Sequence, residues 1–251
     1  MNSKQETIHL WDQKAKDYQR FSRNLDSFYL KILAKIAQRG IVWSDKSVLD
    51  IGCGTGVYTL HLAQEAAHIT ALDVSSKMLA ILYEDALKEG FEAKITPLCC
   101  AWEDFCSNAL FDIVFSSMAP AFHSDSDFEK MNAYARAYCV FLGWGGKRES
   151  TLLDPIFKAH GKALNVPAGS QKLKTWLERV AIHYTSEYIE DTHVQTKSYD
   201  EAFSAIIWHL EMNAITPDMG LIRAFLEKQK DAKGDISFQT TIGVELISWK
   251  K

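Results

Sequence analysis

Three glycines and two acids lie close together near the start of the chain. Residues 47–56 read SVLDIGCGTG, and a second acid, Asp73, ends the apolar run HITAL at 68–72. The glycines and the leading acid are Gly52, Gly54, Gly56 and Asp50. Glycine has no Cβ atom, so a ligand can lie directly against the backbone. A carboxylate at the end of the second strand of a βαβ unit can accept hydrogen bonds from a ribose diol. The pattern predicts a nucleoside pocket at the carboxyl edge of a parallel sheet.

Alternating apolar runs and helical patterns predict the elements that position this pocket. Val48, Leu49 and Ile51 form a short buried strand that breaks into the glycines, after which a helical pattern begins. The expected order is strand 47–51, helix 57–65, strand 68–73, helix 76–89 and strand 93–98. The first N–H groups of the helix at 57 point into the same crevice as the glycine turn.

The spacing of the glycines indicates which nucleoside is bound. The dinucleotide fingerprint is G-x-G-x-x-G, whereas this turn reads G-x-G-x-G with Asp50 two residues ahead. An acid at the mouth repels a pyrophosphate but suits an ammonium or sulfonium group, and Asp73 argues against a 2′-phosphate. A dinucleotide oxidoreductase is therefore disfavoured. A glycine turn without a ligand does not need both acids at these separations.

Residues 11–146 resemble the class I S-adenosylmethionine-dependent methyltransferases. LDIGCGTG is very like the first motif of that family, and Asp73 in DVSSKML matches its second-strand acid. The resemblance implies an α/β fold: a Rossmann-like, seven-stranded, mostly parallel sheet with an antiparallel last strand, helices on both faces and a helical cap. It also implies an enzyme that uses S-adenosylmethionine and releases S-adenosylhomocysteine.

The resemblance assigns residues to the cofactor. The glycine turn, the second-strand acid, the adenine loop at 99–105 and the end of the fourth strand contribute Tyr18, Asp50, Gly52, Cys53, Gly54, Gly56, Asp73, Val74, Met78, Ala101, Trp102, Glu103, Ser116 and Ser117. Tyr18 belongs to a W-x-x-x-A-x-x-Y helix that closes over the cofactor in many members, although an amphipathic helix packed on the domain is the other interpretation. Ala101 replaces the usual aspartate. Trp102 either stacks on the base or covers the sheet edge.

The acceptor side is less well defined. Ser116 to Met118 are expected over the sulfonium methyl, because the fourth strand lies beside the first at the switch point. The loop reads S-M-A-P and lacks the N-P-P-Y type of tetrapeptide found in enzymes that methylate bases. We therefore expect a small-molecule acceptor, with Trp11, Met118 and Arg148 lining its pocket, or with Arg148 in a solvated basic loop.

A general base is needed only for an acceptor that must lose a proton. His123 is the best-placed histidine, because its loop leaves the sheet at the carboxyl edge, and His160 and His209 are the other candidates. The alternative for each of them is an ordinary surface or core imidazole.

The rest of the chain predicts a cap. We expect N-terminal helices at 4–21 and 25–38 within a region 1–42 that forms part of the cap, and a methyltransferase domain over 43–251. An insertion at about 148–180 forms a lid, after a helix at 125–138, a fifth strand at 138–144 and a flexible exit at 145–148. The late elements are a strand at 181–196, helices at 199–212 and 217–232, and a final strand at 236–249.

Composition restricts the partners. The chain has 251 residues and a net charge of −4, so it offers no broad cationic field for nucleic acid. Five cysteines without C-x-x-C spacing suit a reducing cytoplasm and predict no metal site. No apolar run is long enough to span a membrane, and the N-terminus lacks a signal peptide's apolar core. We expect a cytoplasmic monomer or homodimer. The alternatives are a methyltransferase of RNA or protein, and a non-catalytic cofactor-binding module.

Overall fold

The computed structural model describes residues 3–23 and 28–251 and divides into two compact units. The larger unit comprises residues 11–145, 168–188 and 245–251, and the smaller unit comprises residues 1–10, 146–167 and 189–244. The region 148–180, predicted to form a lid, is therefore divided between the two units. Residues 148–167 belong to the smaller unit, together with residues 189–244, and residues 168–180 belong to the larger unit. Leu25, the expected start of the second helix, lies outside the described residues.

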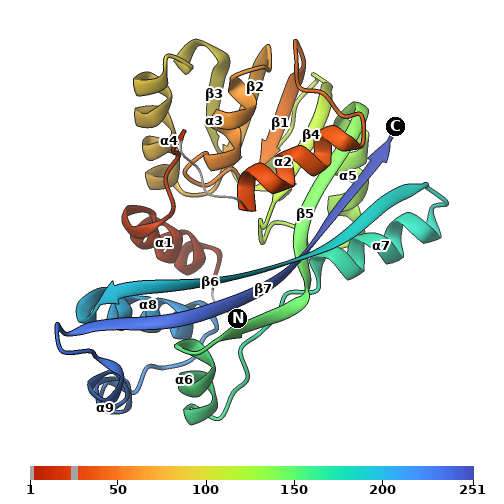
Figure 1. Ribbon diagram of the computed structural model, residues 1–251. Helices are drawn as coiled ribbons and strands as arrows, with labels where there is room; N and C mark the ends of the chain where they lie inside the picture. The colour runs from red at the N-terminus through yellow and green to blue at the C-terminus, as the bar shows by residue number, and fades with distance from the viewer. Residues whose placement is uncertain (1–2, 24–27) are drawn as a thin grey trace. The chain divides into compact units, whose positions relative to one another are not determined.

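The seven strands form one sheet in the order β3-β2-β1-β4-β5-β7-β6, with β7 antiparallel (Figure 1). β1 (Ser47–Ile51) pairs in parallel with β2 (His68–Asp73) and with β4 (Phe111–Ser117). β3 (Ile95–Cys99) pairs with β2, and its register places Cys99 opposite Asp73. The predicted fold class is confirmed. Because β1 and β4 are neighbours, the topological switch point lies at their carboxyl ends.

Three long strands contribute residues to both units: β5 (Ala135–Ser150), β6 (Tyr184–Ser198) and β7 (Asp235–Lys250). The prediction of a flexible exit at 145–148 is wrong, since all four residues belong to β5. Two adjacent glycines favour a turn when only the local sequence is considered. Pairing with a neighbour of equal length, β7, extends the ladder through them, because glycine weakens a strand without forbidding it.

Most helices lie where the sequence predicts them, but the helix expected at 4–21 ends at Lys14 and the helix expected at 125–138 ends at Tyr134. The helices of the larger unit are α2 (Phe28–Gln38), α3 (Val57–Ala63), α4 (Ser76–Glu89), α5 (Asp125–Tyr134) and α7 (Gly169–Arg179), with single 3₁₀ turns η1 (Ala15–Asp17), η2 (Glu92–Lys94) and η3 (Trp102–Asp104). α1 (Lys4–Lys14) contributes to both units. Ser75 caps α4 by accepting from the Met78 N–H, as its position in the sequence predicts.

Each unit has its own apolar core. In the larger unit, Phe128, Met131 and Trp176 pack with the buried faces of β1, β4 and β5. In the smaller unit, α6 (Leu153–Ala159), α8 (Tyr199–Met212) and α9 (Met219–Gln229) enclose a second cluster. Pro155 lies in the first turn of α6, where its missing N–H costs no hydrogen bond. Within the described ranges, no helix is both long and apolar enough to cross a membrane.

Candidate functional site

The glycine turn between β1 and α3 is fastened to the end of β2. The N–H groups of Gly52 and Cys53 both donate to the carbonyl oxygen of Leu72, at 2.8 and 3.0 Å. Gly52 has φ of +72°, a left-handed conformation, and a Cβ atom there would lie 2.4 Å from the Cβ of Ala119. Only glycine fits this position, so the turn presents bare backbone at the carboxyl edge of the sheet.

Asp73 joins this turn to the start of α4. Its carboxylate accepts from the N–H of Gly54 at 2.8 Å and from the N–H of Ser75 at 2.9 Å. Burial raises the pKa of Asp73. The hydrogen bonds from these backbone N–H groups lower the pKa and offset part of that rise. The two hydrogen bonds fix the carboxylate at the end of β2, where the sequence predicts it. A carboxylate oxygen has capacity for a further donor, such as a ribose hydroxyl.

Asp12, which is not among the residues predicted from the sequence, extends the same hydrogen-bonded group. Its Oδ1 accepts from the hydroxyl of Ser75 at 2.6 Å and from the N–H of Lys77 at 3.3 Å. An N-terminal acid thus caps a helix 63 residues further along the chain. The negative charge of Asp12 contributes to the raised pKa of Asp73. No local motif marks such a long-range cap.

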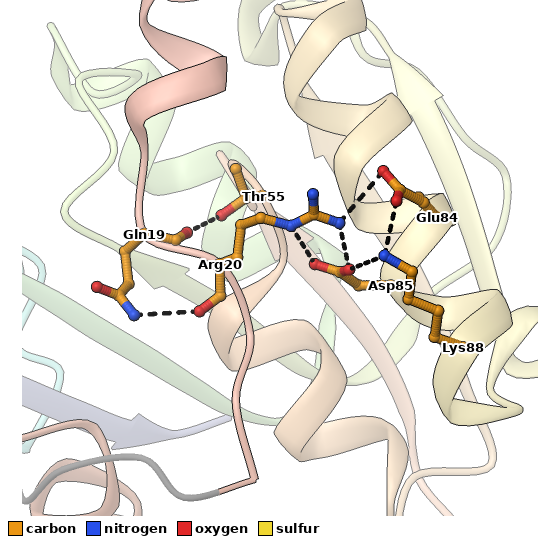
Figure 2. A network of polar contacts seen from close by, with 6 residues as sticks. All are labelled: Gln19, Arg20, Thr55, Glu84, Asp85 and Lys88. Carbon is orange, nitrogen blue, oxygen red and sulfur yellow. Dashed lines mark hydrogen bonds and ion pairs between the residues drawn. The ribbon is translucent and has the colours of Figure 1, made fainter.

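Residues 11–23, which we call the N-terminal strap, contact the glycine turn and α4. The carbonyl oxygen of Gln19 accepts from the hydroxyl of Thr55, and the Arg20 guanidinium pairs with Asp85 through two nitrogens (Figure 2). Tyr18 lies beside Gly54: a Cβ built there would be 3.7 Å from Cε1 of the tyrosine. Tyr18 is 39% exposed, so part of the ring remains accessible. The strap therefore covers the turn from one side.

We expect Arg20→Ala to loosen the strap without unfolding the protein. Asp85 is 10% exposed and keeps a 3.6 Å contact with Lys88, so removal of Arg20 leaves it partly compensated. The Arg20 side chain is 39% exposed, and the loss of unfolding free energy should be about 1 kcal/mol or less. Hydrogen exchange of residues 11–23 should accelerate by up to about fivefold, because local opening becomes easier. Arg23→Ala removes the more exposed pair with Glu89 and serves as the control. Equal exchange in both variants would contradict the role of Arg20.

Asp50 is buried within the fold instead of lying at an open mouth. Its side chain accepts a 2.6 Å hydrogen bond from Thr59 of α3, and the residue is 2% exposed. Burial raises the pKa of Asp50 to about 7. The carboxyl is therefore close to half protonated at neutral pH, whereas the sequence alone predicts an ionised group.

This raised pKa predicts a pH-dependent stability that Asp50→Asn removes. In the unfolded chain the group ionises near pH 4, whereas in the folded chain it keeps its proton up to about pH 7. The stabilisation is therefore complete at low pH and is lost as the pH rises from 4 to 7, by about 4 kcal/mol. Urea unfolding of both proteins between pH 4.5 and 8.5 measures the difference. Parallel stability curves would show that Asp50 ionises normally in the folded state.

The surroundings of Trp102, in the predicted adenine loop at 99–105, bear on its two predicted roles. Trp102 is 3% exposed, packs against Phe105 and has the Lys130 ammonium 4.6 Å from its ring centroid. Its indole N–H donates to the carbonyl oxygen of Asp127 at 3.3 Å. These contacts favour the interpretation that Trp102 covers the edge of the sheet, and stacking on a base stays a prediction. Contact through the backbone of Ala101, Trp102 or Glu103 stays a prediction.

Two adjacent serines at the end of β4 have different environments. Ser116 is fully buried, and its hydroxyl donates to the carbonyl oxygen of Ile51 at 2.9 Å, so it joins β4 to β1. Ser117 is half-buried and ends the strand. Met118 follows with φ of +53°, and its N–H donates to the carbonyl oxygen of Leu142 at 2.7 Å. Ser117 and Met118 are therefore the better placed of these residues to meet a ligand.

The remaining cofactor residues lie around the turn and the start of α4. Gly56 is the N-cap of α3, and the thiol of Cys53 donates weakly to the carbonyl oxygen of Gly54 at 3.7 Å. Val74 is half-buried beside Asp73, and Met78 is buried in the first turn of α4. The structure thus brings all of these residues into the same region of the larger unit as Asp73.

The candidate bases and acceptor residues have different surroundings. His123 is exposed, and its backbone N–H, not its ring, donates to the carboxylate of Asp127. Both ring nitrogens of His160 are engaged, Nδ1 by the carbonyl oxygen of Ile156 and Nε2 by the N–H of Asp218, so His160 is structural. In the larger unit, Trp11 contacts Tyr18 edge to face at 6.2 Å.

Arg148 lies in β5 within the smaller unit and is not in a solvated loop. Its guanidinium donates to the carbonyl oxygen of Asn165 at 3.2 Å and lies 3.4 Å from Nδ1 of His209. Burial lowers the pKa of Arg148. Across the described parts of the chain, no group of histidine, cysteine and acidic side chains could hold a metal ion.

Fold and turn together define a Rossmann-like α/β protein with the glycine turn and second-strand acid of nucleoside-binding folds. Residues 48–140 match the family model described as "Methyltransferase domain". The predicted resemblance of this region to the class I S-adenosylmethionine-dependent methyltransferases is therefore confirmed. Members of this family use S-adenosylmethionine as methyl donor.

Individual relatives cover different shares of the chain. An "Uncharacterized protein" of Haemophilus influenzae is 27% identical over 232 residues, which are 90% of this chain and 84% of that protein. The cypemycin N-terminal methyltransferase of a Streptomyces species is 31% identical over 134 residues, 52% of this chain and 53% of that enzyme. The crystal structure of a putative methyltransferase from Bacillus halodurans shares the fold, with a TM-score of 0.55, 16% identity and coverage of 87% of this chain and 98% of that one. This chain thus spans about half the length of the Streptomyces enzyme.

Proposed function

We propose that the chain is an enzyme that transfers a methyl group from S-adenosylmethionine to a small-molecule acceptor and releases S-adenosylhomocysteine. The observation that carries the proposal is the pair of hydrogen bonds from Gly54 and Ser75 to Asp73. They hold a carboxylate against bare backbone at the end of β2, which suits a ribose diol beside a closely approaching ligand. Five free cysteines fit a reducing, cytoplasmic compartment.

The residues of the larger unit fit this cofactor by their chemistry. Asp73 would hold the ribose hydroxyls, and the backbone at Ala101 to Glu103 would meet the adenine. Tyr18 would cover the ligand from the strap, since it already lies beside Gly54. When bound, S-adenosylmethionine supplies a methyl group on a positively charged sulfur. The chain then needs to align the acceptor and exclude water, which is where proximity lowers the barrier.

The acceptor side is proposed from a smaller set of residues. Ser117 and Met118 end the strand at the switch point, and Trp11 adds an apolar ring within the same unit. His123 would take a proton only from an acceptor that must lose one, such as a hydroxyl.

Turnover screening tests the proposal. The purified full chain is incubated with S-adenosylmethionine and a panel of metabolites that includes hydroxyl, amine and thiol acceptors, and homocysteine is measured after enzymatic cleavage of the product. We expect acceptor-dependent release with one chemical class. Release with short RNA or with protein substrates, and with no metabolite, would replace the small-molecule proposal. With an alcohol acceptor, which does not itself titrate between pH 6 and 9, the pH dependence of the rate shows whether a base is used.

A further inference from the structure

A buried tyrosine hydroxyl near the glycine turn lacks a hydrogen-bond partner. Tyr58 is the second residue of α3 and is 7% exposed, and its hydroxyl makes no hydrogen bond with any residue in the described ranges. Buried polar groups in native proteins are nearly always paired, because an unpaired group loses its hydration without replacement. Such a group at the edge of a candidate site suggests that a ligand supplies the missing partner.

The ring of Tyr58 is held in place by aromatic contacts. Its centroid lies 5.3 Å from that of Phe115 in β4 and 5.1 Å from that of Tyr29 in α2. The hydroxyl is therefore positioned by packing and not by a hydrogen bond. A group held in this way is ready to bind a ligand, since little side-chain entropy remains to be lost.

The neighbours of Tyr58 place its hydroxyl at the switch point. Phe115 pairs in register with Asp50, and Ser117 lies two residues further along β4, on the same face of the sheet. The Ser117 side chain lies near the Tyr58 hydroxyl without the geometry of a hydrogen bond, and Asp50 contributes to the electrostatic field around it. Burial, followed by the nearby Tyr29, raises the pKa of Tyr58, so the hydroxyl keeps its proton and can donate it in a hydrogen bond.

The strand order indicates which part of a ligand reaches this point. β2, with Asp73, lies on one side of β1, and β4, with Ser117, lies on the other. Two strand spacings separate the two strands, about 10 Å. The proposed cofactor carries its adenine and its amino-acid group on opposite sides of the ribose. With the ribose at Asp73 and the adenine toward the loop after β3, the amino-acid group extends toward β1 and β4.

We propose that the Tyr58 hydroxyl binds the amino-acid end of the cofactor by donating a hydrogen bond to its carboxylate. The inference rests on the proposed function, because it assumes that S-adenosylmethionine occupies the site. Tyr58 is a positioning residue: it fixes the end of the cofactor that is remote from the adenine.

Tyr58→Phe tests this with two ligands that differ only at that end. The variant keeps the ring and its contacts with Phe115 and Tyr29. Isothermal titration should show about tenfold weaker binding of S-adenosylhomocysteine and unchanged binding of 5′-methylthioadenosine, which has no amino-acid group. The ligand-free variant should melt at the same or a higher temperature, because an unpaired buried hydroxyl has been removed. Tyr83→Phe, at an exposed tyrosine of α4, is the matched control.

The other outcomes are distinct. Equal weakening for both ligands, unchanged affinity for both, or a lower melting temperature of the ligand-free variant would overturn the role of Tyr58 and leave the proposed function intact. A wild-type protein that binds neither ligand would overturn the proposed function, and the inference with it.

Discussion

Asp73→Ala should weaken binding of S-adenosylhomocysteine about 100-fold or more. The carboxylate is fixed by Gly54 and Ser75, so it meets a ribose diol without reorganisation. Two hydrogen bonds to a charged acceptor together contribute about 3 kcal/mol or more, which corresponds to the expected factor. Asp73→Asn keeps the shape but loses the charge, and we expect an intermediate loss of about tenfold. Isothermal titration of all three proteins gives the comparison.

A second acid provides the control for this variant. Asp112, at the start of β4, also accepts hydrogen bonds from a backbone N–H and a hydroxyl, both of Ser47 at 2.8 Å. It lies at the opposite end of its strand from Ser117, so Asp112→Ala should leave the affinity unchanged. If both alanine variants bound the ligand equally well, Asp73 would not be the ribose-binding group. Circular dichroism of each variant verifies that the folded protein is being titrated.

Gly56→Ala should produce a large loss of stability. Gly56 has φ of +82°, and a Cβ atom there would lie 2.1 Å from Cδ1 of Leu82 in α4. Left-handed strain costs about 1–2 kcal/mol and overpacking about 1–3 kcal/mol, so the free energy of unfolding should fall by about 2–5 kcal/mol. Urea denaturation measures the change. Because Gly56 allows α3 and α4 to approach, cofactor affinity should fall as well.

Two further variants separate strain from overlap. Gly40 has φ of +76°, and a Cβ atom there would have no other atom within 4 Å, so Gly40→Ala reports left-handed strain alone, about 1 kcal/mol. Leu82→Ala leaves a cavity and costs about 2–5 kcal/mol by itself, but in the Gly56→Ala background the new methyl group occupies part of that space. We therefore expect the double variant to be more stable than the sum of the single effects implies. Strict additivity would contradict the contact between Gly56 and Leu82.

Local sequence patterns predict the centre of this fold well. The strands around the glycine turn, the cap at Ser75 and the position of Asp73 all depend on residues close together in the chain, where periodicity and turn chemistry are informative. The sheet architecture is predicted from the family resemblance, and that resemblance depends on the same local motifs. Tyr18 lies beside Gly54, and the cofactor role that the resemblance implies for it stays a prediction.

Features that depend on distant contacts could not be predicted in this way. The cap from Asp12 to Ser75 and the pair of Arg20 with Asp85 join residues more than sixty positions apart. The length of β5 depends on its neighbour β7, which overrides the turn signal of two glycines. Burial decides the packing role of Trp102, the pKa of Asp50 and the unpaired state of Tyr58, and burial depends on the whole surrounding unit.

The most direct test of cofactor binding at the glycine turn is an equilibrium titration of the full chain with S-adenosylhomocysteine, with NAD in a parallel experiment. We expect one-site binding of S-adenosylhomocysteine that Asp73→Ala weakens, and no comparable binding of NAD. The absence of heat with S-adenosylhomocysteine, together with tight binding of NAD, would contradict it.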